Sequence, residues 1–484
     1  MKSRVTHSIK FNVLMNMILT SSSLLFPLIS VPYVSRVLST SGMGYVAFAQ
    51  SFSSYFCLIA MLGMTYYGVR ACSAVRDDPA ALSKTVKELL ILLFISSSIV
   101  TVFYIIFLIF VPQLRNQSEL FVIFGFTIWL GSFGAEWFYQ ALEQYDYITV
   151  RSVCFKILSL ILMFLLIHSK GDYVIYGCII VFAGYGSNIL NLLRLFKLVD
   201  FKQKQKLDVV RHLKPMFWFM VAAVSSGMYI QVDLVMLGFI GSNYMVGIYQ
   251  LVSKIKSVLV TAMNSVGNVM LPRLSYYQAN NRGNDADQLI AKNFNFVIVC
   301  GLYIIAILIL CADPIVAILG GNDFAFSAVP LRFVGPSILF SAMNIVLANH
   351  MISNSMEKSW ATVNVLGLAS AVIFNGLLIP FFGVIGAAIS ISLCEANMFL
   401  MRSFVCRHFL AKIKTLVDPF KVLFSFVASL VLSILFVSFM RISNILLSLF
   451  VPFFVFSIAY AILLLLFRER LVLELSKQFF HRFK

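Results

Sequence analysis

Charged residues are scarce in this sequence. They make up 12% of its 484 residues, and Asp and Glu together number only 20. A soluble globular domain carries about a quarter charged residues because its surface faces water, so this composition excludes a soluble protein. No Walker A segment is present, which argues against ATP hydrolysis through a P-loop. The eight Cys and six His form no CxxC and no metal-ligand spacing, so we expect no cofactor and cysteines that pack as small apolar residues.

The sequence contains many long hydrophobic segments. Hydrophobic residues make up 60% of the chain and gather in continuous segments. Segments of about twenty residues are long enough for a helix to cross a hydrocarbon layer of about 30 Å, whereas a transmembrane barrel would show shorter strands of alternating polarity. We therefore predict an all-α polytopic membrane protein with about 14 transmembrane helices. The predicted spans are 11–31, 41–66, 89–112, 119–141, 149–169, 173–195, 216–240, 244–271, 293–319, 329–351, 361–380, 384–406, 419–440 and 445–467.

The basic residues are distributed unevenly among the connections. Lys and Arg number 37, which gives a net charge of +17, and in a soluble protein that excess would suggest nucleic acid. With a cytoplasmic N-terminus, however, about thirty of them fall in the two tails and the even-numbered connections. The opposite connections hold only Arg36, Arg115, Lys170, Arg332 and Arg441. The positive-inside rule then predicts both termini in the cytoplasm, a retained first helix and attraction to anionic membrane lipids.

A weak internal repeat suggests how the spans are grouped. Gly177 precedes Asn188 by eleven residues in the sixth predicted span, and Gly386 precedes Asn397 by eleven in the twelfth. Two six-helix lobes in parallel pseudo-repeat, with a pathway at their interface, are a common transporter plan. The expected parts are an N-terminal lobe (1–200), a basic cytoplasmic linker (201–214), a C-terminal lobe (215–410) and an extra hairpin with a basic tail (411–484).

The charged residues predicted at membrane depth are Asp233, Lys254, Lys256 and Glu395, with Glu136 nearer the cytoplasmic end of its span. A charge at membrane depth costs at least about 2.5 kcal/mol on insertion scales, so it normally faces a partner or a water-filled cavity. Lys254 lies about 15 Å along its helix from the preceding turn, close to the midplane. We predict that Lys254 faces a cavity with Asp233 as its counter-ion. An ion pair that only locks two helices is the alternative.

Three stretches, spread over nearly the whole chain, resemble motifs of the O-antigen flippases. The matching segments are PYVSRVL (32–38) with GMGY (42–45), EWFYQALE (136–143) with YIT (147–149), and DLVMLG (233–238) with GIY (247–249) and LPRLS (271–275). Ser39 stands where the family usually has glycine. The chain thus resembles the Wzx-type flippases of the polysaccharide transport family, whose superfamily also holds multidrug exporters and the lipid II flippase.

The resemblance implies transport of an undecaprenyl-diphosphate-linked oligosaccharide across a bacterial inner membrane, from the cytoplasmic to the periplasmic leaflet. The diphosphate and sugar head need a polar path, because hydroxyls and charges lose water in hydrocarbon. The residues expected in the cavity or at its inner rim are Lys254, Asp233, Arg36, Arg70 and Arg273. The aromatic residues expected to stack on sugar rings, or to anchor at the interface, are Tyr66, Tyr67, Trp137 and Tyr139.

Energy for transport is expected from a proton or sodium gradient, since no nucleotide motif is present. Asp233 and Glu395 are the carboxylates near mid-span, and Glu395, which shows no obvious basic partner in the sequence, is the preferred proton carrier. The lipid-linked substrate and inner-membrane lipids are the expected partners, with a polysaccharide polymerase and a chain-length regulator as further candidates and no nucleic acid. The alternatives are a multidrug or cation antiporter, whose cavity would be acidic, and a membrane-embedded glycan-processing enzyme.

Overall fold

The computed structural model of the protein describes residues 9–115, 117–202, 206–279, 282–354, 356–440 and 444–473. Its regular elements are helices, and these ranges contain no strand. The chain forms two compact units, Met1–Gly247 and Ile248–Lys484. The predicted lobe boundaries at 200 and 215 stay predictions; the compact units divide further along, inside a helix.

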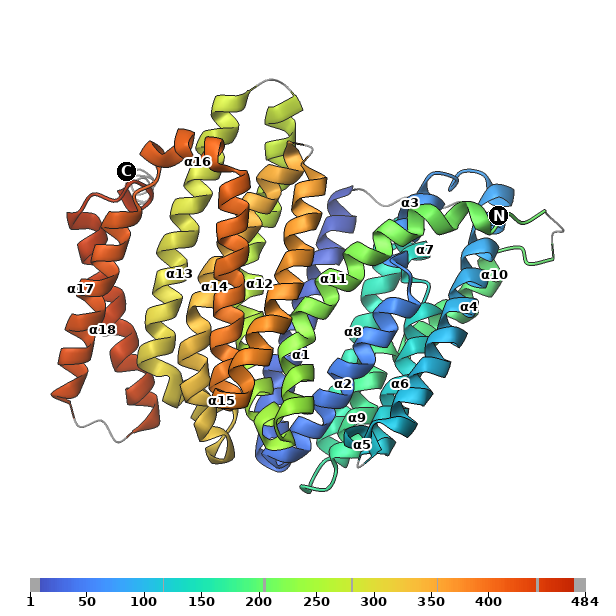
Figure 1. The fold of residues 1–484 in the computed structure, drawn as a ribbon, viewed down its shortest axis with the longest axis horizontal. Helices are drawn as coiled ribbons and strands as arrows, with labels where there is room; N and C mark the ends of the chain where they lie inside the picture. Colours follow the sequence, from blue (N-terminus) through green and yellow to red (C-terminus); the bar gives the residue numbers. More distant parts are fainter. Residues whose placement is uncertain are drawn as a thin grey trace. The chain divides into compact units, whose positions relative to one another are not determined.

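The first unit is built mainly around one helix, α2. In chain order its helices are α1 (Ile9–Val37), α2 (Thr40–Ala60), α3 (Met64–Ser73), α4 (Pro79–Phe110), α5 (Pro112–Arg115), α6 (Ser118–Ser132), α7 (Glu136–Ala141), α8 (Tyr145–Leu166), α9 (Tyr173–Val181), the π-helical turn η1 (Phe182–Gly186), α10 (Asn188–Leu198) and α11 (Val210–Ile240). α2 packs against α4, α6, α9 and α11, and α1 pairs with α8 (Figure 1). α11 therefore belongs to the first unit.

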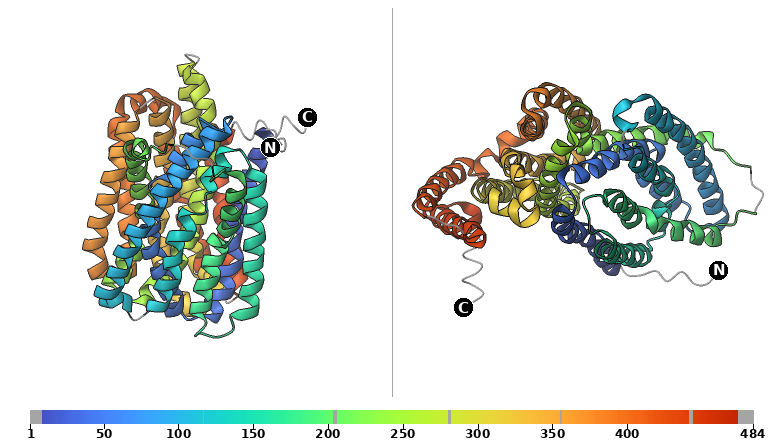
Figure 2. Two further views of the ribbon diagram at one scale, coloured as in Figure 1. Left: turned by 90° about the vertical axis from the view of Figure 1, so that its right-hand side faces the viewer. Right: turned by 90° about the horizontal axis from the view of Figure 1, so that it is seen from below.

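The second unit is a row of packed helices. α12 (Asn243–Ala279) starts in the first unit and continues into the second, followed by α13 (Gly283–Leu319), the 3-10 turn η2 (Asn322–Ser327), α14 (Ala328–Ser353), α15 (Glu357–Val405), α16 (Arg407–Ile413), the 3-10 turn η3 (Lys414–Leu416), α17 (Pro419–Ser438) and α18 (Ile445–Leu466). α14 packs between α13 and α15, and α17 and α18 pack on α13 (Figure 2).

The predicted number of spans is confirmed. The described residues contain 13 helical stretches long and apolar enough to cross a membrane. One of them, Lys358–Val405, is broken at Gly383, whose φ of 54° and ψ of −126° lie outside helical geometry. It therefore holds two spans, one on each side of the break, in agreement with the predicted spans 361–380 and 384–406.

Two predicted spans are interrupted near one end. α2 gives way to α3 through Leu62 and Gly63, with φ of 48° and 69°, and α6 gives way to α7 through Ala135, with φ of 46°. Left-handed backbone ends a helix. The short helices α3 and α7 pack on each other, where the indole of Trp137 lies so close to Gly68 that a Cβ there would be 2.9 Å from the ring.

The C-terminal hairpin, α17 and α18, is packed through an apolar seam. Val422 of α17 and Phe456 and Tyr460 of α18 are buried together with Leu302 and Ile305 of α13. α17 begins with Pro at its first position, and the Asn444 side chain accepts hydrogen bonds from two backbone N–H groups at the start of α18, which are typical helix starts. The extra hairpin expected from the sequence is thus part of the second unit.

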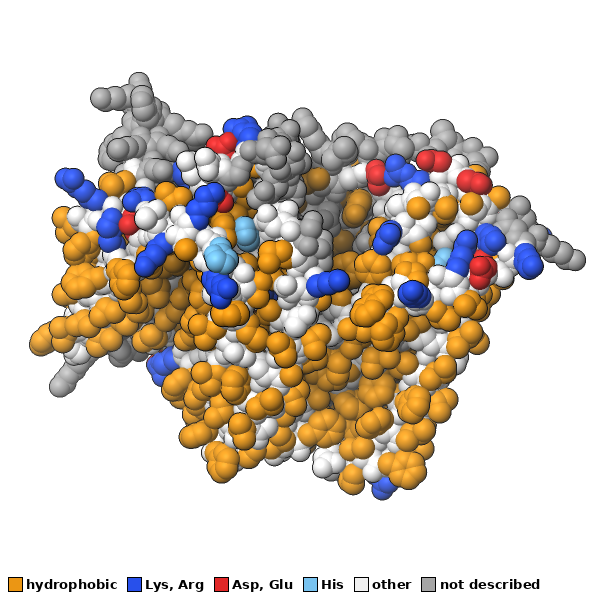
Figure 3. Space-filling model, turned by 45° about the horizontal axis from the view of Figure 1, so that its top comes forward, with side chains coloured by type: hydrophobic (Ala, Val, Ile, Leu, Met, Phe, Trp, Pro, Cys, Tyr) orange, Lys and Arg blue, Asp and Glu red, His pale blue; other side chains and the backbone are white. Residues whose placement is uncertain are grey.

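The surface of each unit fits a membrane. In the face that Figure 3 shows, basic side chains gather at one end of the helices, above a broad band of hydrophobic side chains. Large apolar side chains are exposed along whole helices, such as Phe94, Phe103 and Phe110 of α4. Exposed apolar area of this extent is stable only against lipid.

Candidate functional site

The predicted site residues of the first unit do not form one cluster. Arg36 is exposed at the end of α1, where Nη1 donates to the Pro32 carbonyl (3.3 Å). Arg70 is exposed in the last turn of α3. The 21 residues of α2, a length of about 30 Å, lie between these two ends of the unit. Asp233, by contrast, is buried in α11 and only 2% exposed.

Asp233 lies at a polar seam between α2 and α11. Ser51 Oγ of α2 donates to Gln231 Oε1 of α11 (3.1 Å), and Tyr55 Oη donates to the Met228 carbonyl (3.1 Å). The contacts bring hydroxyl and amide groups together between two long helices, and the Tyr55 hydroxyl interacts electrostatically with the Asp233 carboxylate. The seam can hold an ionised group or a polar head group at membrane depth.

Lys254, the predicted cavity cation, is half-buried in α12, where Ser257 Oγ donates to its carbonyl (2.8 Å). Lys254 belongs to the second unit and Asp233 to the first, so their pairing stays a prediction. Arg273 lies within α12, but its side chain is outside the described part of the chain.

Glu395 lies in a network of hydrogen bonds inside the second unit. Asn344 Nδ2 of α14 donates to Glu395 Oε2 (2.8 Å) and to the Glu395 carbonyl (3.0 Å). Arg402, two turns further along α15 and 5% exposed, donates to the Asn344 carbonyl (2.7 Å) and to Asn364 Oδ1 (2.8 Å). The sequence suggested no basic partner for Glu395, because Arg402, although inside the predicted span 384–406, was counted with the cytoplasmic charges. The structure instead buries Arg402 and links it to Glu395 through Asn344.

Two further cations at membrane depth were missed by sequence reasoning. Arg151 and Lys156 were counted among the cytoplasmic charges although both fall inside the predicted span 149–169, and α8 includes both. Arg151 is 6% exposed, and its Nη1 donates to the Ser187 carbonyl (2.8 Å). Lys156 Nζ donates to Ser22 Oγ (2.9 Å) and Ser23 Oγ (2.7 Å) of α1. The run of hydroxyl side chains from Ser21 to Ser23 inside an apolar helix is the sequence signal that could have indicated this contact.

The aromatic residues of the segment 136–143 pack inside the first unit. Trp137 and Tyr139 are 3% and 0% exposed, so the prediction that they stack on sugar rings is wrong. Tyr139 Oη donates to the Asn191 carbonyl (2.7 Å), and the Arg194 guanidinium lies 3.9 Å from the ring centre of Tyr147. These contacts fix α7 between α8 and α10. Tyr66, which is 59% exposed, is still open to a ligand.

A buried carboxylate fixes the start of α11. Glu88 of α4 is fully buried and accepts from the backbone N–H of Asp208 (2.7 Å), from Arg211 (2.5 Å) and from His212 (2.9 Å). His212 Nδ1 lies 2.6 Å from Tyr67 Oη. Tyr67 is 9% exposed and therefore belongs to this network, not to a sugar-binding surface.

The starts of α2 and α12 cross at backbone contact. A Cβ on Gly44 would lie 1.8 Å from the Asn243 carbonyl oxygen, and a Cβ on Gly247 would lie 1.9 Å from the Thr40 carbonyl oxygen. The contact is reciprocal, since Gly44 lies four residues after Thr40, which Gly247 faces, and Gly247 lies four residues after Asn243, which Gly44 faces. Gly44 of GMGY and Gly247 of GIY thus both lie at this crossing within the first unit.

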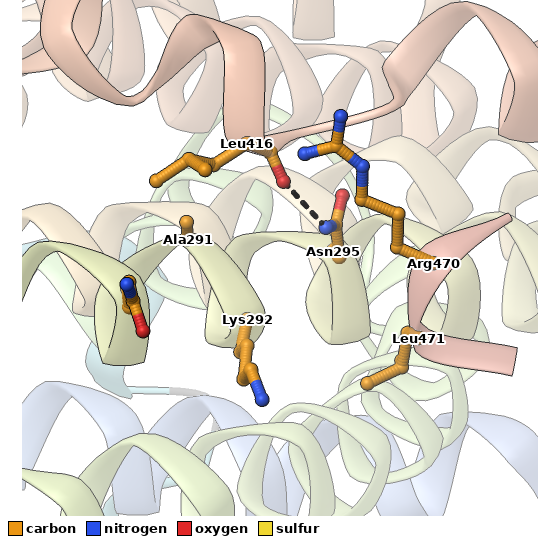
Figure 4. A pocket seen from close by; sticks show the side chains of 7 residues that line it. Ala291, Lys292, Asn295, Leu416, Arg470 and Leu471 are labelled. Carbon is orange, nitrogen blue, oxygen red and sulfur yellow. Dashed lines mark hydrogen bonds between the residues drawn. The ribbon is translucent and has the colours of Figure 1, made fainter. Parts of the chain in front are cut away.

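A cavity of about 200 Å³ lies at one end of the second unit (Figure 4). Its polar groups join segments: Asn295 Nδ2 of α13 donates to the Leu416 carbonyl (3.0 Å), and Arg470 donates to the Thr415 carbonyl (2.8 Å) and pairs with Asp418 (3.5 Å). None of the predicted site residues lines it. The described residues contain no group of His, Cys, Asp and Glu able to hold a metal ion.

Comparison with known sequences decides the family. The profile of a family described as "Polysaccharide biosynthesis protein" matches residues 9–278, more than half of the chain. The chain belongs to this family. The chain is 22% identical over 399 residues to the "Putative O-antigen transporter" of Shigella dysenteriae, covering 81% of this chain and 98% of the relative. It is 21% identical to the protein of the same name in Escherichia coli K12, covering 80% and 94%.

Comparison with solved structures identifies the fold. The lipid II flippase MurJ in an inward closed conformation superposes with a TM-score of 0.72 at 14% identity, covering 93% of this chain and 99% of that one. An inward-facing MATE multidrug transporter gives a TM-score of 0.59 at 12% identity, with coverages of 84% and 99%. The predictions of family, of the helical fold and of a multi-pass membrane transporter in place of an enzyme are therefore confirmed.

Proposed function

We propose that this protein is a flippase that moves a diphosphate-linked oligosaccharide repeat unit from the cytoplasmic to the periplasmic leaflet of a bacterial inner membrane. The observation that carries the proposal is the family match over residues 9–278, together with relatives named as O-antigen transporters. A membrane bundle with charged and hydroxyl side chains at depth supports it, because a sugar head with a diphosphate needs such groups to replace water.

The lipid-linked substrate has a charged diphosphate, polar sugars and an apolar tail, and different parts of the helix bundle contact each of them. Its diphosphate needs cations and hydrogen-bond donors, and Lys254, eleven residues after the start of α12, supplies both. The polar seam of Ser51, Tyr55, Gln231 and Asp233 offers hydroxyl and amide groups to sugar hydroxyls. The apolar tail stays in lipid, against exposed hydrophobic side chains. The two units alternate access by exchanging which end of the pathway is open.

Energy coupling is assigned to the Glu395 network. Glu395 accepts from Asn344, and protonation would remove the charge that this bond stabilises. Arg402 shares Asn344 with it, so a change at Glu395 is transmitted to both segments of α15. A proton is the ion that this arrangement suits, since a carboxylate at membrane depth readily exchanges one.

A multidrug or cation antiporter is the alternative, because the fold is shared with a MATE transporter. The two functions differ in cargo charge: cationic drugs need an acidic cavity, whereas a diphosphate needs basic groups. Lys254 and Lys156 at membrane depth favour the anionic cargo.

The test of the proposed function is complementation. A bacterial strain that lacks its own O-antigen flippase and makes a matching repeat unit should display surface glycan again when it carries this gene. Mass spectrometry of the lipid extract should show that the undecaprenyl-linked repeat no longer accumulates. Continued accumulation with the protein present in the membrane, over several donor repeat units, would contradict the proposal.

A further inference from the structure

α1 and α8 run parallel in one fixed register. Their interhelical hydrogen bonds repeat the same offset of 134 residues at three depths. The bonds join Thr149 Oγ1 to the Met15 carbonyl, Lys156 Nζ to Ser22 Oγ, and Tyr33 Oη to the Ile167 carbonyl that follows α8. The outer two bonds are 2.9 Å and 2.7 Å long and involve neutral groups. They are enough to hold the register, so the middle contact is not required for it.

The middle contact puts a cation where it is costly. Lys156 lies eleven residues into the 22 residues of α8, about 16 Å from either end. Its ammonium donates to the hydroxyls of Ser22 and Ser23, and Glu136 acts on it electrostatically from beyond the ion-pairing distance of 4 Å. A neutral side chain would make the same bonds to serine without the cost of a charge at that depth.

Arg151, one and a half turns earlier in α8, shows the difference between a fixed cation and an available one. Its guanidinium is 6% exposed and donates to a backbone carbonyl, that of Ser187 (2.8 Å). Lys156 is half-buried, and it has three N–H donors of which two are accounted for by hydroxyls. Hydroxyls are weaker acceptors for an ammonium than an anion is, so an anion can replace them.

The two serines also suit an anion. Ser22 Oγ donates to the Leu19 carbonyl (2.7 Å) and Ser23 Oγ donates to the same carbonyl (3.0 Å). Rotation about one side-chain bond turns either hydroxyl from its own helix toward a ligand beside Lys156. An ammonium and two hydroxyl donors on neighbouring helices are the groups that bind phosphate oxygens well.

We propose that Lys156, Ser22 and Ser23 form a phosphate-binding site at mid-membrane depth and that its ligand is the diphosphate of the lipid carrier. The inference rests on the proposed function and adds to it a cargo contact in the first unit, separate from Lys254. A phospholipid phosphate has the same chemistry, and the test separates the two sources.

The test measures binding to purified full-length protein in detergent by native mass spectrometry. The probes are undecaprenyl diphosphate, undecaprenol and phosphatidylglycerol. The variants are Lys156→Gln, Lys156→Arg and, as a matched loss of one exposed charge, Lys197→Gln at the end of α10. Wild type should prefer the diphosphate over undecaprenol. In Lys156→Gln the ratio of diphosphate binding to undecaprenol binding should fall at least about tenfold, as expected for the loss of one charge-assisted hydrogen bond. Lys197→Gln and Lys156→Arg should keep most of that ratio.

The outcomes separate this inference from the proposed function. A Lys156→Gln protein that keeps the full diphosphate preference overturns the site. Equal, Lys156-dependent binding of phosphatidylglycerol overturns the carrier assignment in favour of a phospholipid phosphate. If Lys156→Gln also binds undecaprenol poorly, the Lys156→Arg protein tests the site instead. The proposed site requires Lys156→Arg to keep its preference for undecaprenyl diphosphate, and loss of that preference overturns the site. Wild type that binds none of the probes and fails complementation counts against the proposed function itself.

Discussion

Replacing Gly44 by Ala tests the crossing of α2 and α12. A Cβ at Gly44 would lie 1.8 Å from the Asn243 carbonyl oxygen, whereas close carbon–oxygen contacts in proteins are about 3.3 Å or longer. The two backbones must therefore separate by about 1.5 Å, and a carbonyl within a helix cannot rotate away. Overpacking of this kind destabilises by about 1–3 kcal/mol, partly offset by up to about 1 kcal/mol from the higher helix propensity of Ala.

Gly42→Ala is the matched control. A Cβ there would lie 3.3 Å from Ser39 Oγ and 3.5 Å from the Tyr173 side chain, so the space is nearly sufficient. Thermal unfolding of the purified proteins, followed by tryptophan fluorescence, should show Gly44→Ala melting several degrees below wild type and Gly42→Ala close to it. Gly247→Ala should resemble Gly44→Ala, because the Thr40 carbonyl lies 1.9 Å from its added Cβ. Equal melting temperatures for Gly44→Ala and Gly42→Ala would refute the crossing.

Three further predictions concern other parts of the chain. Glu88→Gln should lower the free energy of unfolding by about 3 kcal/mol, because it removes the buried carboxylate charge that accepts hydrogen bonds from Arg211 and His212. Chemical denaturation in detergent measures this, and an unchanged midpoint would argue against the network. Glu395→Gln should abolish the response of transport to an imposed pH gradient in vesicles while the protein still binds undecaprenyl diphosphate; an undiminished response excludes Glu395 from coupling. Reporter fusions after Lys170 should report the periplasm and fusions after Lys414 the cytoplasm, and a reversed pair would invert the predicted topology.

The spans were predictable from sequence because a membrane helix must be long and apolar. The helix breaks were not. Leu62 and Ala135 adopt positive φ although neither residue type signals it, so α2–α3 and α6–α7 looked continuous. Their geometry is imposed by the packing of α3 on α7, which a single sequence does not show.

Charged residues were the second point at which the structure differs from the sequence-based prediction. Lys156 and Arg402 fall inside the predicted spans 149–169 and 384–406, but they were counted as cytoplasmic charges under the positive-inside rule, and their role within α8 and α15 was therefore missed. Both lie inside helices because Ser22, Ser23, Asn344 and other polar groups accept their N–H groups. Asp233 and Glu395 were recognised as deep charges because each stands inside an apolar run.

Movement of the lipid-linked sugar between leaflets is the central claim, and a vesicle assay measures it directly. Undecaprenyl diphosphate carrying a fluorescent oligosaccharide is placed in both leaflets of proteoliposomes, and a membrane-impermeant quencher reports the fraction in the outer leaflet over time. With wild-type protein, the account predicts that the quenched fraction rises from about half toward completion as inner-leaflet lipid is exchanged outward, and that Lys156→Gln slows this rise. A quenched fraction that stays at the protein-free level, with folded protein in the vesicles, would contradict the account.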